Sequence, residues 1–160
     1  MADEPEITNQ ENRYCEAIDQ VIEASHEYFL YIAEMKLAMA SLGMAVASGT
    51  RLQATREILD MADTLFQNIT DPDSVLPDNQ RKQLNHADEV WLDMKDKMSK
   101  GDQRASNLLS AHAFMEMAIV HLISCKKDIR FKNSISDYLV NYLGKLSVFI
   151  YREAIGHVML

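Results

Sequence analysis

Apolar residues recur along this chain with the period of an α-helix, and one stretch is apolar on nearly every side. Residues 107–125 carry a single formal charge, that of Glu116. The apolar residues cover two faces of a helix, with Leu108, Met115, Ile119 and Leu122 on one face and Phe114, Met117, Ala118 and Cys125 on the other. A helix that is hydrophobic all round belongs inside a bundle. We therefore predict that residues 107–125 form the central helix of a bundle, and that this helix begins near Asp102.

The same stretch is long enough to raise the question of a membrane span. The side chains of Glu116, His112 and His121 lie within it. A charged side chain at the centre of a bilayer costs roughly 2.5–3.5 kcal/mol even on insertion scales. We therefore predict that the protein has no membrane span.

A second apolar stripe predicts a long first helix from about Asn9 to about Ser48. Thr8 and Glu11 have the spacing of a capping box, which marks a helix start. The segment Ala38–Ser48 is rich in small residues, which allow another backbone to approach closely. We expect this segment to pack tightly against another helix or against a second subunit, so that a homo-oligomer could form through Ala38–Ser48. Gly49 is the predicted C-cap.

Three further segments complete the prediction. The pattern favours helices over Thr50–Ile69, over Asp78 to about Ser99, and over a last stretch that follows a predicted cap at Ser134 with Asp137. Gly101 and the Asp- and Pro-rich residues 70–77 separate them. We predict an all-α fold of about five helices in one up-down bundle over residues 8–160, preceded by a disordered acidic tail at residues 1–7.

Composition agrees with an all-α, intracellular protein. The chain has 5 glycines and 3 prolines in 160 residues, which is few for a β protein. Its two cysteines, Cys15 and Cys125, have neither a disulfide framework nor a metal-binding spacing. The first residues are acidic and lack the pattern of a leader peptide. We expect a reducing, cytoplasmic location.

Charge is distributed very unevenly along the chain. The net charge is −8, and residues 1–34 hold nine acidic residues and one basic residue, so they account for all of it. This balance argues against nucleic acid as a partner. On a continuous first helix, five of the acidic residues fall on the side opposite the apolar stripe: Glu16, Asp19, Glu23, Glu27 and Glu34.

We call this set the acidic ridge. Like charges at i,i+4, such as Glu23 and Glu27, destabilise an isolated helix. A helix that accepts this cost is expected to serve a basic protein partner. Two alternatives stay open. The ridge is a solvated face that confers solubility, or the basic residues within Lys126–Lys132 lie against it in the folded protein.

Histidine and glutamate pairs provide the second candidate site. His112 with Glu116, and Glu153 with His157, each share a helix face at i,i+4. These four residues define a metal- or cofactor-binding hypothesis, although a di-iron bundle needs two E-x-x-H motifs and this chain has one, Glu23 with His26. The alternatives are a core contact between His112 and Glu116, or a phosphorelay role for His112.

No strong catalytic motif is present. The sequence therefore predicts a non-enzymatic protein-interaction module, an adaptor, chaperone-like or regulatory bundle that needs no cofactor and presents the acidic ridge to a basic partner. The alternative function is a metal- or cofactor-binding bundle that uses the His/Glu pairs.

Overall fold

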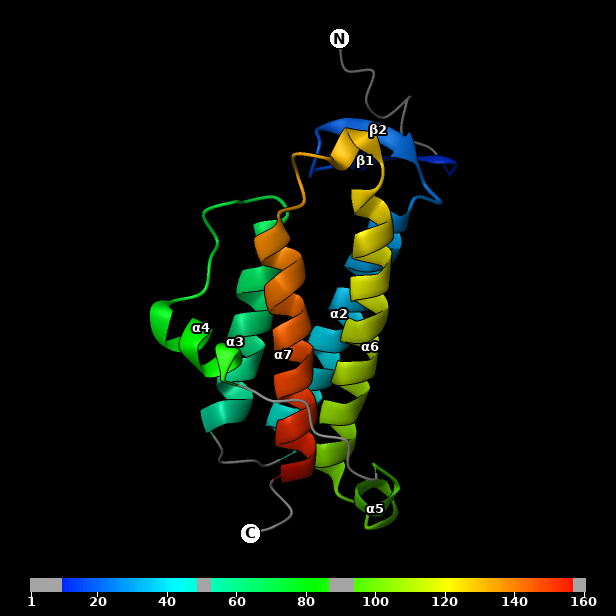
Figure 1. Ribbon diagram of the computed structural model, residues 1–160. Helices are drawn as coiled ribbons and strands as arrows, with labels where there is room; N and C mark the ends of the chain where they lie inside the picture. Colours follow the sequence, from blue (N-terminus) through cyan, green and yellow to red (C-terminus); the bar gives the residue numbers. More distant parts are fainter. Residues whose placement is uncertain (1–9, 49–52, 87–93, 157–160) are drawn as a thin grey trace.

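Four long amphipathic segments of the chain form the bundle of this computed structural model, which describes residues 10–48, 53–86 and 94–156. They are α2 (Glu27–Ala47), α3 (Gln53–Asn68), α6 (Gln103–Lys126) and α7 (Asp137–Gly156). In Figure 1 these helices lie side by side, with α2 next to α6 and α3 next to α7. The predicted all-α fold is confirmed, and so are the helices expected over 50–69 and 107–125. The predicted tail at residues 1–7, the cap at Thr8 and the cap at Gly49 lie outside the described residues.

The helices do not follow a simple up-down order. Arg104, at the start of α6, donates to the Thr55 hydroxyl at the start of α3 and to the Glu153 carbonyl near the end of α7. Helices α3 and α6 therefore run in the same direction. A long crossover connects them, and it contains the short helices α4 (Asp78–Asn85) and α5 (Met94–Ser99) (Figure 1). Bundles with one such crossover are an established variant of the fold.

The crossover replaces the single third helix that the sequence predicted over Asp78–Ser99. Within α4 only Leu84 is buried, which reflects the thin apolar side of that segment. The crossover is fastened to α7, because the Leu76 amide donates to the Tyr138 hydroxyl (2.8 Å) and the Asn85 amide group donates to the Tyr142 hydroxyl (3.4 Å). Gly101 ends it with a positive φ of 69°, which glycine adopts without strain.

The first half of the predicted first helix is a β-hairpin. Strands β1 (Asn12–Cys15) and β2 (Gln20–Glu23) pair antiparallel, with Cys15 opposite Gln20. Asp19 lies in the connecting turn with a φ of 52°, a left-handed conformation that aspartate tolerates better than most residues. Helix α2 begins only after His26, whose Nδ1 accepts a hydrogen bond from the Tyr28 amide (3.0 Å). The prediction of a continuous helix from Asn9 was therefore wrong.

Helices α2 and α6 pack very closely along an antiparallel seam of small residues. Ala38, Ala45, Ala111 and Ala118 are fully buried, and the Ser41 and Ser110 hydroxyls lie 3.2 Å apart. Of the two expectations for Ala38–Ser48, packing on another helix is confirmed. The buried small residues of that segment are covered by α6, which leaves Ala40, Met44 and Ala47 as its exposed part.

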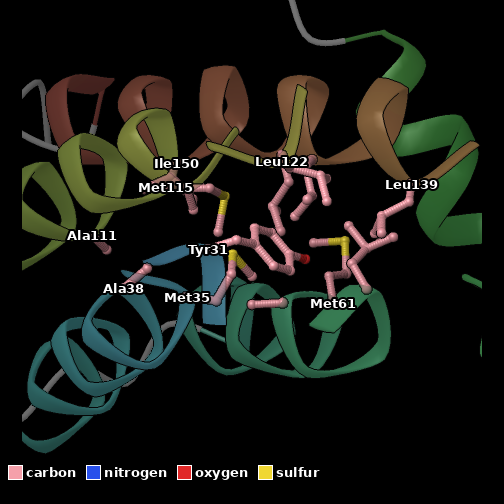
Figure 2. Close-up of a cluster of buried hydrophobic side chains, with 14 of the residues drawn as sticks. Tyr31, Met35, Ala38, Met61, Ala111, Met115, Leu122, Leu139 and Ile150 are labelled. Atoms are coloured by element: carbon pink, nitrogen blue, oxygen red, sulfur yellow. The ribbon is translucent and has the colours of Figure 1, made fainter. Parts of the chain in front are cut away.

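Methionine, aliphatic and aromatic side chains fill the core, and all four long helices contribute to it. Figure 2 shows Tyr31 and Met35 of α2 against Met61 of α3, Met115 and Leu122 of α6, and Leu139 and Ile150 of α7. Each of these side chains is fully buried. The Tyr31 hydroxyl has no hydrogen-bond partner among the described residues, and its burial raises the pKa of that phenol.

The sequence predicted that helix α6 would be enclosed on every side. In the structure, part of its circumference is exposed. It packs on α2 and α7, and its outward residues Met117, Val120 and Ile123 are 50%, 63% and 43% exposed. An apolar helix in a four-helix bundle has two neighbours, so part of its circumference faces outward.

Candidate functional site

A pocket of about 1270 Å³ lies between α5, α6 and α7. Its walls are mainly apolar and include Met94 and Met98 of α5 and Leu109 of α6. Its polar groups include the side chains of His112, Glu116 and Tyr151. A concave, apolar site with a few polar groups is the usual form of a small-molecule site.

His112 is held in one orientation by α7. Its Nδ1 lies 2.9 Å from the Ser147 carbonyl oxygen and 2.9 Å from the Ser147 hydroxyl, and its ring lies 5.0 Å from the ring of Tyr151. A carbonyl oxygen can only accept, so in the neutral imidazole Nδ1 carries the proton and Nε2 carries the lone pair. Nε2 has no partner among the residues that the structure describes.

Glu116 joins this arrangement through Ser147. The Ser147 hydroxyl, which is fully buried, donates to the Glu116 carboxylate over 2.6 Å. The contact predicted between His112 and Glu116 is therefore made through a serine of the neighbouring helix. A carboxylate that reaches a histidine through a hydrogen-bond relay helps to fix the orientation of the ring.

Of the other two members of the proposed metal set, the structure describes Glu153, which does not line this pocket. Glu153 lies beyond Tyr151 on α7, and its carboxylate acts on Arg104. His157 lies outside the described residues. Among the described residues, His112 and Glu116 therefore share the pocket without Glu153.

A second polar cluster fastens the hairpin to the far end of α6. Nε2 of His26 lies 2.8 Å from Asp128, and the Arg130 guanidinium pairs with Asp128 (2.7 Å) and Glu23 (2.8 Å). Hydrogen bonds from Arg130 lower the pKa values of both carboxyl groups. The expectation that the basic residues within Lys126–Lys132 meet the acidic ridge is confirmed for Arg130.

This cluster also has the composition of a metal site. Ligand atoms of Glu23, His26 and Asp128 lie within 4.8 Å of one another. However, both ring nitrogens of His26 already make hydrogen bonds, and Arg130 pairs with both carboxylates. The cluster is best described as a clamp of ion pairs, which we call the hairpin clamp (Glu23, His26, Asp128 and Arg130).

The rest of the acidic ridge is dispersed. Asp19 accepts a hydrogen bond from the Tyr14 hydroxyl within the hairpin (2.5 Å), and Glu16 lies in the same turn. Glu34 is buried in the α2–α6 seam, where it pairs with Nδ1 of His121, and Glu27 approaches the other ring nitrogen at 3.6 Å. The five acidic residues do not form one helical face, because residues 12–23 are not helical.

Sequence reasoning missed one surface completely. Helices α2 and α6 pack against each other and each exposes three large apolar side chains, a set that we call the outer face: Leu30, Leu37 and Met44 of α2, and Met117, Val120 and Ile123 of α6. The three residues of α2 are spaced by seven, which places them on one side of a helix. That spacing is visible in the sequence and could have identified the face.

The two helices of the outer face, Glu27–Ala47 and Gln103–Lys126, are also long and apolar enough to cross a membrane by length and composition. In the bundle they pack against each other and are partly buried.

A family model described as "Domain of unknown function (DUF1940)" matches residues 14–156. The chain belongs to this family. The match covers the hairpin from Tyr14 onward and all four long helices of the DUF1940 protein, so the hairpin clamp, the pocket and the outer face all fall within the family domain. None of the curated proteins matches the chain.

Proposed function

We infer that this DUF1940 protein is a non-enzymatic interaction module in which two copies of the chain dock through their outer faces. The observation that supports this function is the exposure of six large apolar side chains on two adjacent helices. Leu37, Met44 and Met117 are 46%, 58% and 50% exposed. Contiguous apolar surfaces of this kind on soluble proteins mark interaction sites.

The dimensions of the outer face suit a weak, reversible dimer. Leu30 and Met44 lie 14 positions apart on α2, so the face is about 21 Å long. Two helices packed at the usual separation make it about 20 Å wide. The resulting footprint of about 400 Å² is about half of the ~800 Å² per partner that a stable interface of standard size buries.

The net charge restricts the surfaces through which two copies can meet. The protein carries a net charge of −8, so two copies repel each other except across a neutral surface. The six large apolar residues of the outer face lie on stretches with few charged residues: α2 has none after Lys36, and the Glu34 carboxylate is buried against His121. Because the outer face is neutral, it does not attract a basic partner. We therefore place the interaction here rather than on the acidic residues.

The same apolar face could in principle contact lipid. Anionic lipid headgroups repel an acidic protein, and the polar side chains of Glu34 and His121 lie within the two helices. Both facts support a protein partner over a membrane.

Sedimentation velocity from micromolar to near-millimolar concentration tests this function. We expect a reversible dimer, and we expect Leu37→Glu or Met117→Glu to weaken it about 100-fold, because a charge would be buried twice in a symmetric interface. Val75→Glu is the matched control, since Val75 is 51% exposed but lies in the crossover. A chain that stays monomeric throughout, or that binds neutral or anionic vesicles through Leu37 instead, would refute the proposal.

A further inference from the structure

The pocket between α5, α6 and α7 has a chemistry of its own, which self-association does not use. Its apolar walls lead to two hydrogen-bond acceptors, Nε2 of His112 and the carboxylate of Glu116. We propose that this pocket binds a small amphipathic cation, an apolar molecule that ends in a protonated primary or secondary amine.

The two acceptors are arranged for a donor that carries positive charge. Since Nδ1 of His112 is committed to the Ser147 carbonyl, the lone pair of Nε2 is available in the neutral ring. Glu116 receives one hydrogen bond from Ser147 and retains further acceptor capacity. An ammonium group has several donors and one charge, so it can satisfy both groups at once, and hydrogen bonds to charged groups are the stronger kind.

The apolar part of the ligand is matched by the walls of the pocket. Met94 and Met98 of α5 and Leu109 of α6 line it, and both methionines are about half exposed. Methionine side chains adapt to apolar ligands of different shape. The ring of Tyr151, itself packed on His112, adds an aromatic surface, and aromatic faces attract cations.

Two other ligand classes fit this pocket less well. A metal ion would find two ligand side chains here, His112 and Glu116, and no group of three among the described residues includes them. An anion would face the Glu116 carboxylate. Lys95 also lines the pocket, but this residue already has an interaction of its own.

The first test compares three probes that share one apolar chain, namely n-octylamine, n-octanol and octanoate, by isothermal titration calorimetry at neutral pH. We expect saturable one-to-one binding of octylamine, weaker binding of octanol, and the weakest binding of octanoate. Absence of saturable octylamine binding would overturn the proposal, as would equal binding of the three probes, because the apolar walls alone would then account for it.

A substitution of Glu116 tests whether its carboxylate is one of the two acceptors. We expect Glu116→Gln to weaken octylamine binding about tenfold or more, because a hydrogen bond to a charged group is lost. Asp60→Asn removes one exposed carboxylate of α3, outside the pocket, and controls for the general attraction of cations to this acidic protein. Equal effects of the two substitutions would count against the site.

His112 is tested separately. His112→Phe keeps a ring beside Tyr151 and removes the acceptor, so octylamine binding should again weaken while far-UV circular dichroism stays unchanged. In the unsubstituted protein, octylamine should shift the Nε2 resonance of His112 in long-range ¹H–¹⁵N spectra and leave that of His86 in place. If the His112 resonance does not respond at saturation, the pocket is not the binding site. Because these readouts monitor ligand binding by each chain, they are independent of whether the protein dimerises.

Discussion

The His26 imidazole lies 2.8 Å from the carboxylate of Asp128, a residue 102 positions further along the chain. The same ring accepts a hydrogen bond from the Tyr28 amide through its other nitrogen. One side chain therefore caps the start of α2 and connects it to the turn that follows α6. The ring also stacks on Phe131, with 4.9 Å between centroids. Together, these contacts of His26 lie at the end of the bundle next to the hairpin.

The hairpin clamp should make stability depend on acid pH. Hydrogen bonds from Arg130 hold the pKa of Asp128 well below its usual range. A carboxyl group with a lowered folded pKa contributes stability that is present above its unfolded pKa of about 4 and is lost as the pH falls toward the folded value. We expect the free energy of unfolding in urea to fall as the pH drops below about 4.

Asp128→Asn isolates this contribution. The variant should be less stable than the unsubstituted protein near neutral pH, and the difference should shrink as the solution is acidified, because both proteins then lack the charge. Asp60→Asn, at an exposed position outside the clamp, should leave the pH profile unchanged. A constant difference between Asp128→Asn and the unsubstituted protein across the acid range would contradict the assignment.

Arg104 makes the second long-range connection. Its Nε and Nη2 donate to the buried Thr55 hydroxyl at 3.0 and 2.7 Å, and burial lowers the pKa of the guanidinium. Thr55→Val removes the acceptor and keeps the shape. The variant should lose about 1–3 kcal/mol of unfolding free energy, the cost of leaving a buried polar group without its partner.

The control for that change is Thr64→Val, because the Thr64 hydroxyl donates to Asp60 of its own helix and should be worth less than about 0.5 kcal/mol. Adding Arg104→Met to Thr55→Val should recover part of the loss, since the unpaired guanidinium is then gone. Equal urea midpoints for the two valine variants would show that the Arg104 contact is not stabilising.

Helices with long apolar stripes could be predicted from the sequence. The periodicity over 53–68 and 103–126, the small residues of Ala38–Ser48 and the break at Gly101 all have counterparts in the structure. Each of these signals is local, because it depends only on residues within a few turns of one helix.

The hairpin could not be predicted in the same way. Its strands have four residues each, which is too short for alternation to be distinguished from helical spacing, and only Cys15 and Ile22 are buried. Once residues 12–23 were treated as helical, the acidic residues were assigned to one outward side. Glu34 shows the consequence: it faces His121 across the α2–α6 seam, and no pattern within α2 alone reveals that neighbour.

Only part of the pocket could be predicted from the sequence, for a related reason. Spacing within α6 identified His112 and Glu116. Ser147, which joins them, lies 31 positions beyond Glu116 on a different helix. The apolar wall comes from α5, which reaches α6 through the crossover. Pairings between helices are set by topology, and one sequence does not specify them.

The α2–α6 seam should tolerate no larger side chains. Ala38 and Ala111 are fully buried where the two helices approach most closely. Ala38→Leu or Ala111→Leu should cost about 1–3 kcal/mol of unfolding free energy, because the added carbon atoms force the helices apart. Ala47→Leu, at an exposed position of α2, should change the urea midpoint little. Equal midpoints for Ala38→Leu and Ala47→Leu would mean that the helices are not in close contact.

The two cysteines should be unreactive in the folded protein. Cys15 and Cys125 are 0% and 1% exposed, and burial raises the pKa of Cys125 to about 12 and that of Cys15 in the same direction. The thiolate is the reactive form, so both thiols should react very slowly with Ellman's reagent at mildly alkaline pH. In denaturing urea, two thiols per chain should react at once.

Single-cysteine variants resolve the order in which the thiols become accessible. Cys15 belongs to a two-stranded hairpin held mainly by the hairpin clamp, whereas Cys125 lies in α6. Local opening of the hairpin should cost less than global unfolding. Cys15 in a Cys125→Ala background should therefore react faster than Cys125 in a Cys15→Ala background, and Asp128→Asn should accelerate the reaction of Cys15 more than that of Cys125. If either thiol of the folded protein reacts as fast as a free cysteine, the burial described for that residue is wrong. If Cys125 reacts first, the hairpin is not the weaker element.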